Sequence, residues 1–315
     1  LMGRYKDAET YYQQSLNIIK VIFGVKHPAY ANQLNNLAGL YEITKEYIQA
    51  EQLYTQALEI QSEVLGEKHP DYISTLNNLA LLQQKTGNYE KAEELYKKNL
   101  NKTRSTYGTK HPNYATSLSN LAGLYEAVAK YRDAEKLYLE ALQIRKEALG
   151  DKHPAYGLIL INLGRLYAAT KSYAKADSMW YKALSLNLYE IQKYFPSMSE
   201  KEKGEFYATI RLNFEQFNSY AVLRSKENPS ILARMYNNQL ATKALLLNAS
   251  NKLRSTILSS GDSVLINKFK NWLNQKEFLS KVYAMPKEDI IAQKINVDSL
   301  ERGVNASEKE LSQRS

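Results

Sequence analysis

Four asparagines recur at one position of a sequence that repeats every 42 residues: Asn36, Asn78, Asn120 and Asn162. An asparagine side chain both donates and accepts hydrogen bonds, as a peptide group does. Asparagine is only a mediocre helix former, so its recurrence in mid-helix needs a reason. The pattern favours a row of amides that could hold the main chain of an extended peptide. The alternative is a set of bonds that lock each repeat to the next.

Residues around this row vary between repeats and are the candidates for specificity. Positions before it hold Asn32, Asn35 and Asn77, with Ser74, Thr116, Leu158, Ser119 and Ile161 at the equivalent places of other copies. Positions after it hold Gly39, Leu81, Gly123 and Arg165, then Glu42, Gln84 and Glu126, with Lys85 adjacent. Lys85 and Arg165 could attract a carboxylate. Gly39 and Gly123 each cost about 1 kcal/mol relative to alanine, and they could admit a ligand backbone or a neighbouring helix.

Catalytic and metal chemistry find little support in the composition. The chain has no cysteine, and its four histidines lie one per repeat, at 27, 69, 111 and 153. Zinc needs ligands at about 2.0–2.1 Å, whereas packed helices lie about 8–10 Å apart, so neighbouring histidines should not share an ion. We expect them to cap or pack at helix starts. The sequence therefore predicts no catalytic residue, no metal and no cofactor.

The helices that position the asparagines are predicted from the residues that end one helix and start the next in each repeat. Each copy carries a glycine, then Lys-His-Pro, as in Gly24 and Lys26-His27-Pro28. Glycine suits the left-handed end of a helix and proline suits the first turn of the next. A fixed period of this length indicates a solenoid of stacked helix pairs. The predicted units are a half repeat at 1–23 and full repeats at 24–65, 66–107, 108–149 and 150–191. Because the chain opens inside a repeat, we expect it to be a fragment of a longer protein.

The repeat resembles the 42-residue tetratricopeptide repeat of kinesin light chains. The residues that carry the likeness are Leu34, Leu37, Ala38, Tyr41, Ala50, Tyr54 and Ala57, and it extends over roughly residues 1–190. The resemblance implies a right-handed superhelix whose first helices line a concave groove. It also implies that the asparagine row points into that groove, as in related arrays that hold cargo peptides.

Residues 192–315 do not repeat and are predicted to form a helical capping or linker region. Ser199 and Glu202 form a capping box that should start a helix. Segments 194–200 and 237–247 resemble the region that joins repeats to a caspase-like CHAT domain in bacterial TPR-CHAT proteins. That resemblance implies a protease domain beyond Ser315. The dyad of such a protease needs a cysteine, which this chain lacks.

The composition suits a soluble globular protein, and the repeats together with the helical tail predict an all-α fold. Apolar residues make up 44% of the chain, without a run long enough to span a bilayer. The net charge of +9 is spread among both signs, so neither nucleic acid nor membrane is predicted as a partner. We expect a non-enzymatic, cytoplasmic module that binds a peptide or partner protein in its groove, with its own C-terminal domain as a further candidate partner. The alternative is a structural scaffold that assembles with copies of itself or packs on its own effector domain.

Overall fold

The computed structural model describes residues 2–195 and 198–314, and every regular element in these ranges is an α-helix. It divides into two compact units, Leu1–Met179 and Trp180–Ser315, and each is described by itself. The division falls within α9 (Tyr173–Tyr194), whereas the 42-residue period extends the last repeat to residue 191. Pro196 and Ser197, in the segment that resembles TPR-CHAT proteins, lie outside the described residues.

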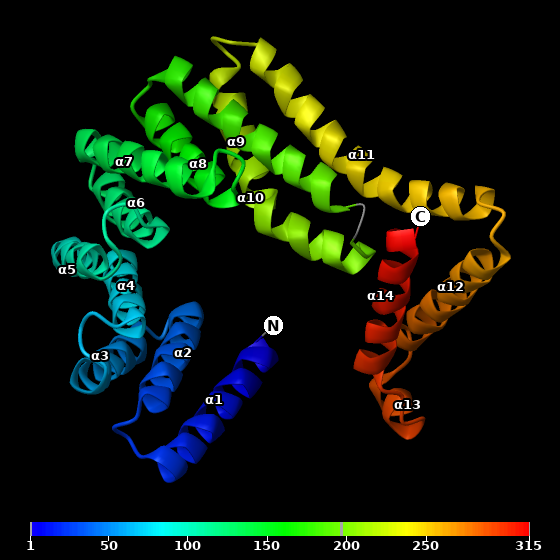
Figure 1. Cartoon of the computed structure of the whole chain (residues 1–315), viewed down its shortest axis with the longest axis horizontal. Helices are drawn as coiled ribbons and strands as arrows, with labels where there is room; N and C mark the ends of the chain where they lie inside the picture. The colour runs from blue at the N-terminus through cyan, green and yellow to red at the C-terminus, as the bar shows by residue number, and fades with distance from the viewer. Residues whose placement is uncertain (1, 196–197, 315) are drawn as a thin grey trace. The chain divides into compact units, whose positions relative to one another are not determined.

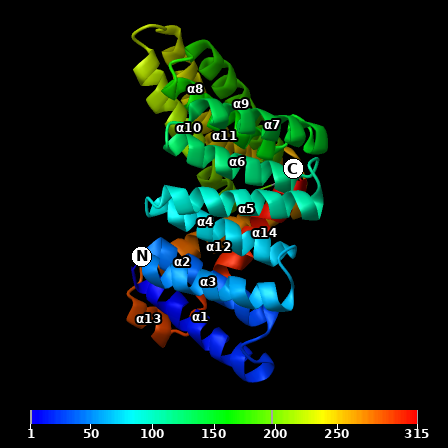
Figure 2. The ribbon, with the colours of Figure 1, turned by 90° about the vertical axis from the view of Figure 1, so that its left-hand side faces the viewer.

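The first unit is a row of helix pairs at the predicted period. The first helices of the four full repeats are α2 (Pro28–Thr44), α4 (Pro70–Lys85), α6 (Pro112–Ala127) and α8 (Pro154–Ala169). The second helices are α1 (Met2–Phe23), α3 (Tyr47–Val64), α5 (Tyr89–Tyr107), α7 (Tyr131–Leu149) and the start of α9. In Figure 1, α2, α4 and α6 lie on the inner side of the row and α3, α5 and α7 on its outer side. Figure 2 shows α3, α5 and α7 stacked in chain order.

The Lys-His-Pro triplets start the first helices, as predicted. Each proline is the first helical residue, and each preceding histidine is the N-cap. The histidine Nδ1 accepts a hydrogen bond from the main-chain N–H two residues later, at 3.2 Å for His27 and 3.1 Å for His111. The upstream glycine takes the left-handed conformation, as at Gly24 with φ of 82°. The interpretation of the histidines as caps is therefore confirmed.

Small residues and tyrosines build a core that passes from one repeat to the next. Ala38 and Ala50 are fully buried where α2 meets α3, and Tyr54 packs against them. The same cluster includes Leu79 and Leu82 of α4, which belongs to the following repeat. An equivalent cluster joins α4, α5 and α6 through Tyr96. Because each helix pair buries its apolar face on its neighbours, the array is stable only as a stack.

The second unit contains the non-repeating helices. They are α10 (Glu200–Arg224), α11 (Ser230–Ser259), α12 (Ser263–Tyr283), α13 (Lys287–Ala292) and α14 (Val297–Arg314). The predicted capping box is present, because Ser199 and Glu202 bond each other's main-chain N–H groups. Helix α14 meets α12 in a core that includes Phe269, Trp272 and Leu311. It is also held to α10, where the buried Glu308 accepts a hydrogen bond from the Glu200 main chain at 2.8 Å.

None of the described helices combines the length and apolar character that crossing a membrane requires. Within the described ranges, no three His, Asp or Glu side chains cluster closely enough to hold a metal ion.

Candidate functional site

The asparagine row joins successive first helices by direct amide-to-amide hydrogen bonds. Asn78 of α4 donates its Nδ2 to Asn35 Oδ1 of α2 at 3.0 Å. Asn120 of α6 donates its Nδ2 to Asn77 Oδ1 of α4 at 2.6 Å. The equivalent acceptor for Asn162 is Ser119, whose hydroxyl donates within its own helix to the carbonyl of Ala115 at 2.8 Å. The lock between repeats that the sequence left open is therefore present at two of the three junctions.

These bonds use only part of each amide. An asparagine side chain offers two N–H donors and an oxygen with two lone pairs. Each cross-repeat bond uses one N–H of one asparagine and one lone pair of the other. Asn36 is exposed, and Asn78, Asn120 and Asn162 are partly exposed. The row thus has hydrogen-bonding groups left over at the surface of the first helices. The predicted groove-lining role and the repeat lock are compatible in this geometry.

Both basic residues of the candidate site already have carboxylate partners. Lys85 donates to Glu42 of the preceding repeat. Arg165 binds Glu126 through two parallel bonds, from Nε at 2.8 Å and Nη2 at 2.9 Å. The same two carboxylates accept bonds from buried tyrosines, Tyr54 at 3.1 Å and Tyr138 at 3.2 Å. The sequence suggests that Lys85 and Arg165 could attract a partner's carboxylate, and in the structure such a group would first have to displace an internal one.

Burial dominates the electrostatics of these tyrosines. It raises the pKa of the Tyr54 hydroxyl, and the charge of Glu42 raises it further. Burial raises the pKa of the Tyr138 hydroxyl in the same way, next to Glu126. The hydrogen bonds with Glu126 raise the pKa of the Arg165 guanidinium. Each tyrosine therefore remains a neutral hydrogen-bond donor to its glutamate. The basic residue of the next repeat binds the same glutamate, so these groups hold adjacent repeats together.

Other predicted site residues also serve the packing. Gln84 takes the place of the two glutamates in its repeat and accepts a bond from Tyr96 at 3.0 Å. Asn32 accepts from Gln61 Nε2 at 3.0 Å and donates to Asp71 at 2.9 Å. Asn32 is thus fixed at the place where α2, α3 and α4 meet.

The two mid-helix glycines approach a tyrosine and leave room for a methyl group. A Cβ at Gly39 would lie 3.7 Å from the Tyr54 hydroxyl, and one at Gly123 would lie 3.5 Å from the Tyr138 hydroxyl. Both distances are ordinary contacts. The second helix of the same repeat therefore approaches these glycines and still leaves room for a methyl group, and a neighbouring helix was one of the two possibilities that the sequence left open.

We expect Gly39→Ala and Gly123→Ala each to stabilise the array by up to about 1 kcal/mol, because alanine has the higher helix propensity. Urea unfolding of the two variants measures this. Gly87→Ala is the matched control, since Gly87 has φ of 83° and alanine is strained there. Loss of stability in the first two variants would show that the tyrosines cannot tolerate the methyl groups.

A series of tyrosine-to-glutamate hydrogen bonds, which we call the ladder, was not predicted from the sequence. Tyr41 donates to Glu9 at 2.8 Å, Tyr125 to Glu93 at 3.1 Å and Tyr167 to Glu135 at 2.7 Å. Each bond joins a first helix to the second helix of the preceding repeat. The glutamates recur every 42 residues, with Glu51 in the remaining copy, so the period itself was the signal that could have revealed them.

The ladder makes the array sensitive to acid. Hydrogen bonds from Lys97, Lys130 and Tyr125 lower the pKa of Glu93 from 4.5 to about 2. A carboxylate with a lowered pKa in the folded state stabilises it above the unfolded value, and this contribution is lost as the pH falls. We expect stability to decline between about pH 4.5 and pH 2, and Glu93→Gln to flatten that decline. Thermal unfolding against pH tests this, and an unchanged slope in the variant would contradict it.

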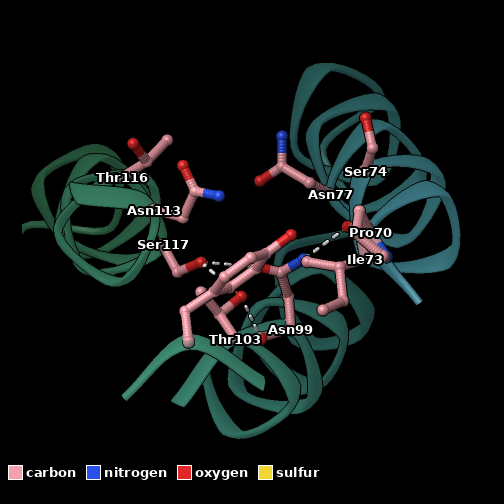
Figure 3. A pocket seen from close by; sticks show the side chains of 10 residues that line it. Pro70, Ile73, Ser74, Asn77, Asn99, Thr103, Asn113, Thr116 and Ser117 are labelled. Carbon is pink, nitrogen blue, oxygen red and sulfur yellow. Dashed lines mark hydrogen bonds between the residues drawn. The ribbon is translucent and has the colours of Figure 1, made fainter. Parts of the chain in front are cut away.

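A pocket of about 270 Å³ opens where α4, α5 and α6 meet. Its floor consists of the buried side chains of Asn99, Thr103 and Ser117, which are hydrogen-bonded to one another. Figure 3 shows Ser74 and Asn77 of α4 facing Asn113 and Thr116 of α6 across the opening. Of these residues, the sequence had singled out Asn77 as a site residue, together with Ser74 and Thr116. Asn113 and the floor were missed.

Tandem helix pairs that recur every 42 residues and pack each on the next define an α-solenoid, a class of protein with no single central core. A family model described as tetratricopeptide repeat matches residues 1–63, 31–100, 71–147 and 128–187. The chain belongs to the tetratricopeptide repeat family. Proteins of this family are generally non-catalytic scaffolds that bind peptide or protein partners.

Solved structures with similar folds include kinesin-light-chain-like repeats. TPR-like repeats of Podosopora anserina, described as those of a kinesin light chain, are 23% identical and cover 59% of this chain and 88% of their own, with a TM-score of 0.50. BtubC (BKLC) from P. vanneervenii is 21% identical, with coverages of 76% and 92% and a TM-score of 0.57. A Rap protein complexed with competence and sporulation factor is 14% identical, with coverages of 79% and 72% and a TM-score of 0.52. No curated protein sequence matches the chain significantly.

Proposed function

We propose that the first helices of the array bind an extended peptide or a segment of a partner protein. The observation that carries the proposal is the row of partly exposed amides on α2, α4, α6 and α8, which retains donors and acceptors after the repeats are locked together. A peptide main chain needs such groups at regular intervals. Asn36, Asn78, Asn120 and Asn162 would bond that main chain, and Asn32, Asn35, Asn77, Gly39, Gly123 and Gln84 would adjoin it.

The paired charges give the same surface a means of selection. Lys85 with Glu42 and Arg165 with Glu126 each present a half-exposed cation beside a carboxylate. A charged partner residue of either sign would have to break an existing ion pair and lose its own hydration. It would gain only a replacement ion pair in return. Uncharged partner segments are therefore favoured over strongly charged ones.

The test compares partner capture with stability. A phage-displayed library of random peptides is selected against the whole chain, and captured peptides are then measured on Asn78→Ala/Asn120→Ala. We expect binding to fall by about tenfold or more, while stability falls by only about 1 kcal/mol for each lost bond. Asn101→Ala, which removes an exposed amide from α5, is the control and should change neither.

A second candidate, a structural scaffold, is favoured by the same cross-repeat bonds. If the amides serve only to lock the stack, the double variant loses stability and still captures the peptides. A library that yields no peptide at all would contradict the recognition proposal. Sedimentation of the wild-type chain would then show whether it assembles with itself.

We also propose that the array is the recognition part of a larger, cytoplasmic protein whose C-terminal domain is a CHAT caspase-like protease. Support comes from the likeness of segments 194–200 and 237–247 to the joining region of TPR-CHAT proteins. In this arrangement the protease domain is itself a candidate partner of the array. Reading the native open reading frame beyond Ser315 tests the idea, and a frame without a histidine and a cysteine in a caspase-like domain would contradict it.

A further inference from the structure

One position of the second helices decides whether the space between successive first helices is filled. It holds Gln61 in α3, Thr103 in α5 and Arg145 in α7, each 42 residues from the last. We call the three places junction one (α2, α3 and α4), junction two (α4, α5 and α6) and junction three (α6, α7 and α8). The pocket of about 270 Å³ lies at junction two.

At junctions one and three, a long side chain from the second helix fills this space. Gln61 is fully buried and donates its amide to Asn32, which in turn bonds Asp71 of the next repeat. Arg145 donates to the carbonyl of Ala155 and to Thr116 Oγ1 at 3.0 Å. In both places the chain supplies its own N–H donors to acceptors on the first helices.

At junction two the side chain is too short to do this. Thr103 turns its hydroxyl to the Asn99 carbonyl at 2.8 Å and to Ser117 at 3.0 Å. Asn99 is also occupied, since it donates to the carbonyl of Ile73 and accepts from Ser117, both at 2.7 Å. The polar side chains of the floor are therefore engaged with one another. The space that Gln61 and Arg145 occupy in their own junctions stays open above it (Figure 3).

We propose that junction two receives the carboxamide side chain of a glutamine or asparagine in a bound peptide. The inference rests on the proposed peptide binding and names the side chain that it selects. Gln61 is an internal model for the occupant, because its carboxamide fills the equivalent place one repeat earlier. Asn77 and Asn113 stand on opposite sides of the opening, and their amides match a carboxamide that both donates and accepts.

Other side chains suit this pocket less well. Its lining has neither an acidic nor a basic residue, and the Arg145 guanidinium that borders it is already bonded to Thr116 and Ala155, so a charged group would lose its hydration without gaining a counter-ion inside the pocket. An aliphatic group would offer no hydrogen-bond partner to the Asn77 and Asn113 amides that face the opening. The volume equals that of about nine water molecules in the liquid, which is enough for one side chain and small for a cofactor.

The experiment first probes the pocket with small molecules on the whole chain. Propionamide and propionate are titrated separately while the ¹H–¹⁵N resonances of the Asn77 and Asn113 side-chain amides are followed. We expect propionamide to bind about tenfold more tightly than propionate, the difference that one or two hydrogen bonds produce. Equal binding of the two probes would overturn the proposal.

Two variants and a control locate the effect. Thr103→Gln copies the residue of junction one and should fill the pocket, and Ser74→Leu copies Leu158 and should cover its exposed rim without removing a buried contact. We expect propionamide binding to fall about tenfold in both, by the same loss of hydrogen bonds. Thr55→Gln on the exposed side of α3 should leave it unchanged. Binding that persists in Ser74→Leu and in a folded Thr103→Gln would overturn the proposal.

The displayed peptides separate this inference from the proposed function. Captured peptides that carry glutamine or asparagine and lose binding to Thr103→Gln or Ser74→Leu support both. Peptides that lack these residues and bind the variants equally overturn the pocket assignment and leave peptide binding intact. Failure to capture any peptide, with propionamide still bound, contradicts the proposed function and overturns the assignment of the pocket to a peptide side chain.

Discussion

Replacing Tyr96 by alanine is expected to destabilise the array by about 3–5 kcal/mol, the range seen when a buried aromatic residue is truncated. Tyr96 is 2% exposed and packs on Ala80 and Ala92, and on Leu121 and Leu124 of the next repeat. The substitution therefore opens a cavity in a core that two repeats share. Urea unfolding followed by circular dichroism measures the loss.

Tyr96→Phe separates packing from hydrogen bonding in the same place. It keeps the ring and removes only the bond to Gln84, so it should cost about 1 kcal/mol. If alanine and phenylalanine had equal effects, the ring would contribute no packing energy, and the continuous core described above would be wrong.

Asn99→Ala is expected to destabilise the array by about 2–3 kcal/mol, although alanine occupies this position in the other full repeats, as at Ala57 and Ala141. Asn99 is 1% exposed. Its removal takes one hydrogen bond from the carbonyl of Ile73 and one from the hydroxyl of Ser117, and each lost bond costs about 0.5–1.5 kcal/mol.

Asn101→Ala on the same helix is the control, because Asn101 is exposed and should change stability by no more than about 0.5 kcal/mol. Hydrogen exchange of the α5 and α6 amides in the Asn99 variant would show where the loss occurs. A neutral or stabilising Asn99→Ala would mean that the consensus of the repeats outweighs the local network, and that the floor of the pocket is not held by Asn99.

Local rules were enough to place the helices of the array. The left-handed glycine, the histidine cap and the first-turn proline act within a few residues of one another, so their pattern fixes helix boundaries without knowledge of the fold. The capping box at Ser199 was predicted correctly for the same reason. The 42-residue period then indicated which helices are equivalent, and the structure has the same pairs.

The partners of the candidate site residues could be predicted only in part. The asparagine row suggested bonds between repeats, but the sequence did not show that Asn78 reaches Asn35 and not Asn36. Lys85 and Arg165 looked available to a ligand, and each is paired with a glutamate of the preceding repeat. The two residues of such a pair are about forty positions apart in the chain, so their contact depends on how adjacent helices are rotated against each other.

The sequence by itself determined the class of this protein, the starts of the first helices and their caps, because these depend on backbone conformation and on short-range hydrogen bonds. Only the tertiary structure decided which polar groups are already used and which remain open. The Thr103 side chain is a few atoms shorter than those of Gln61 and Arg145. The longer side chains fill the space between two first helices, and the shorter one leaves it open. Close packing turns that small difference in length into a pocket.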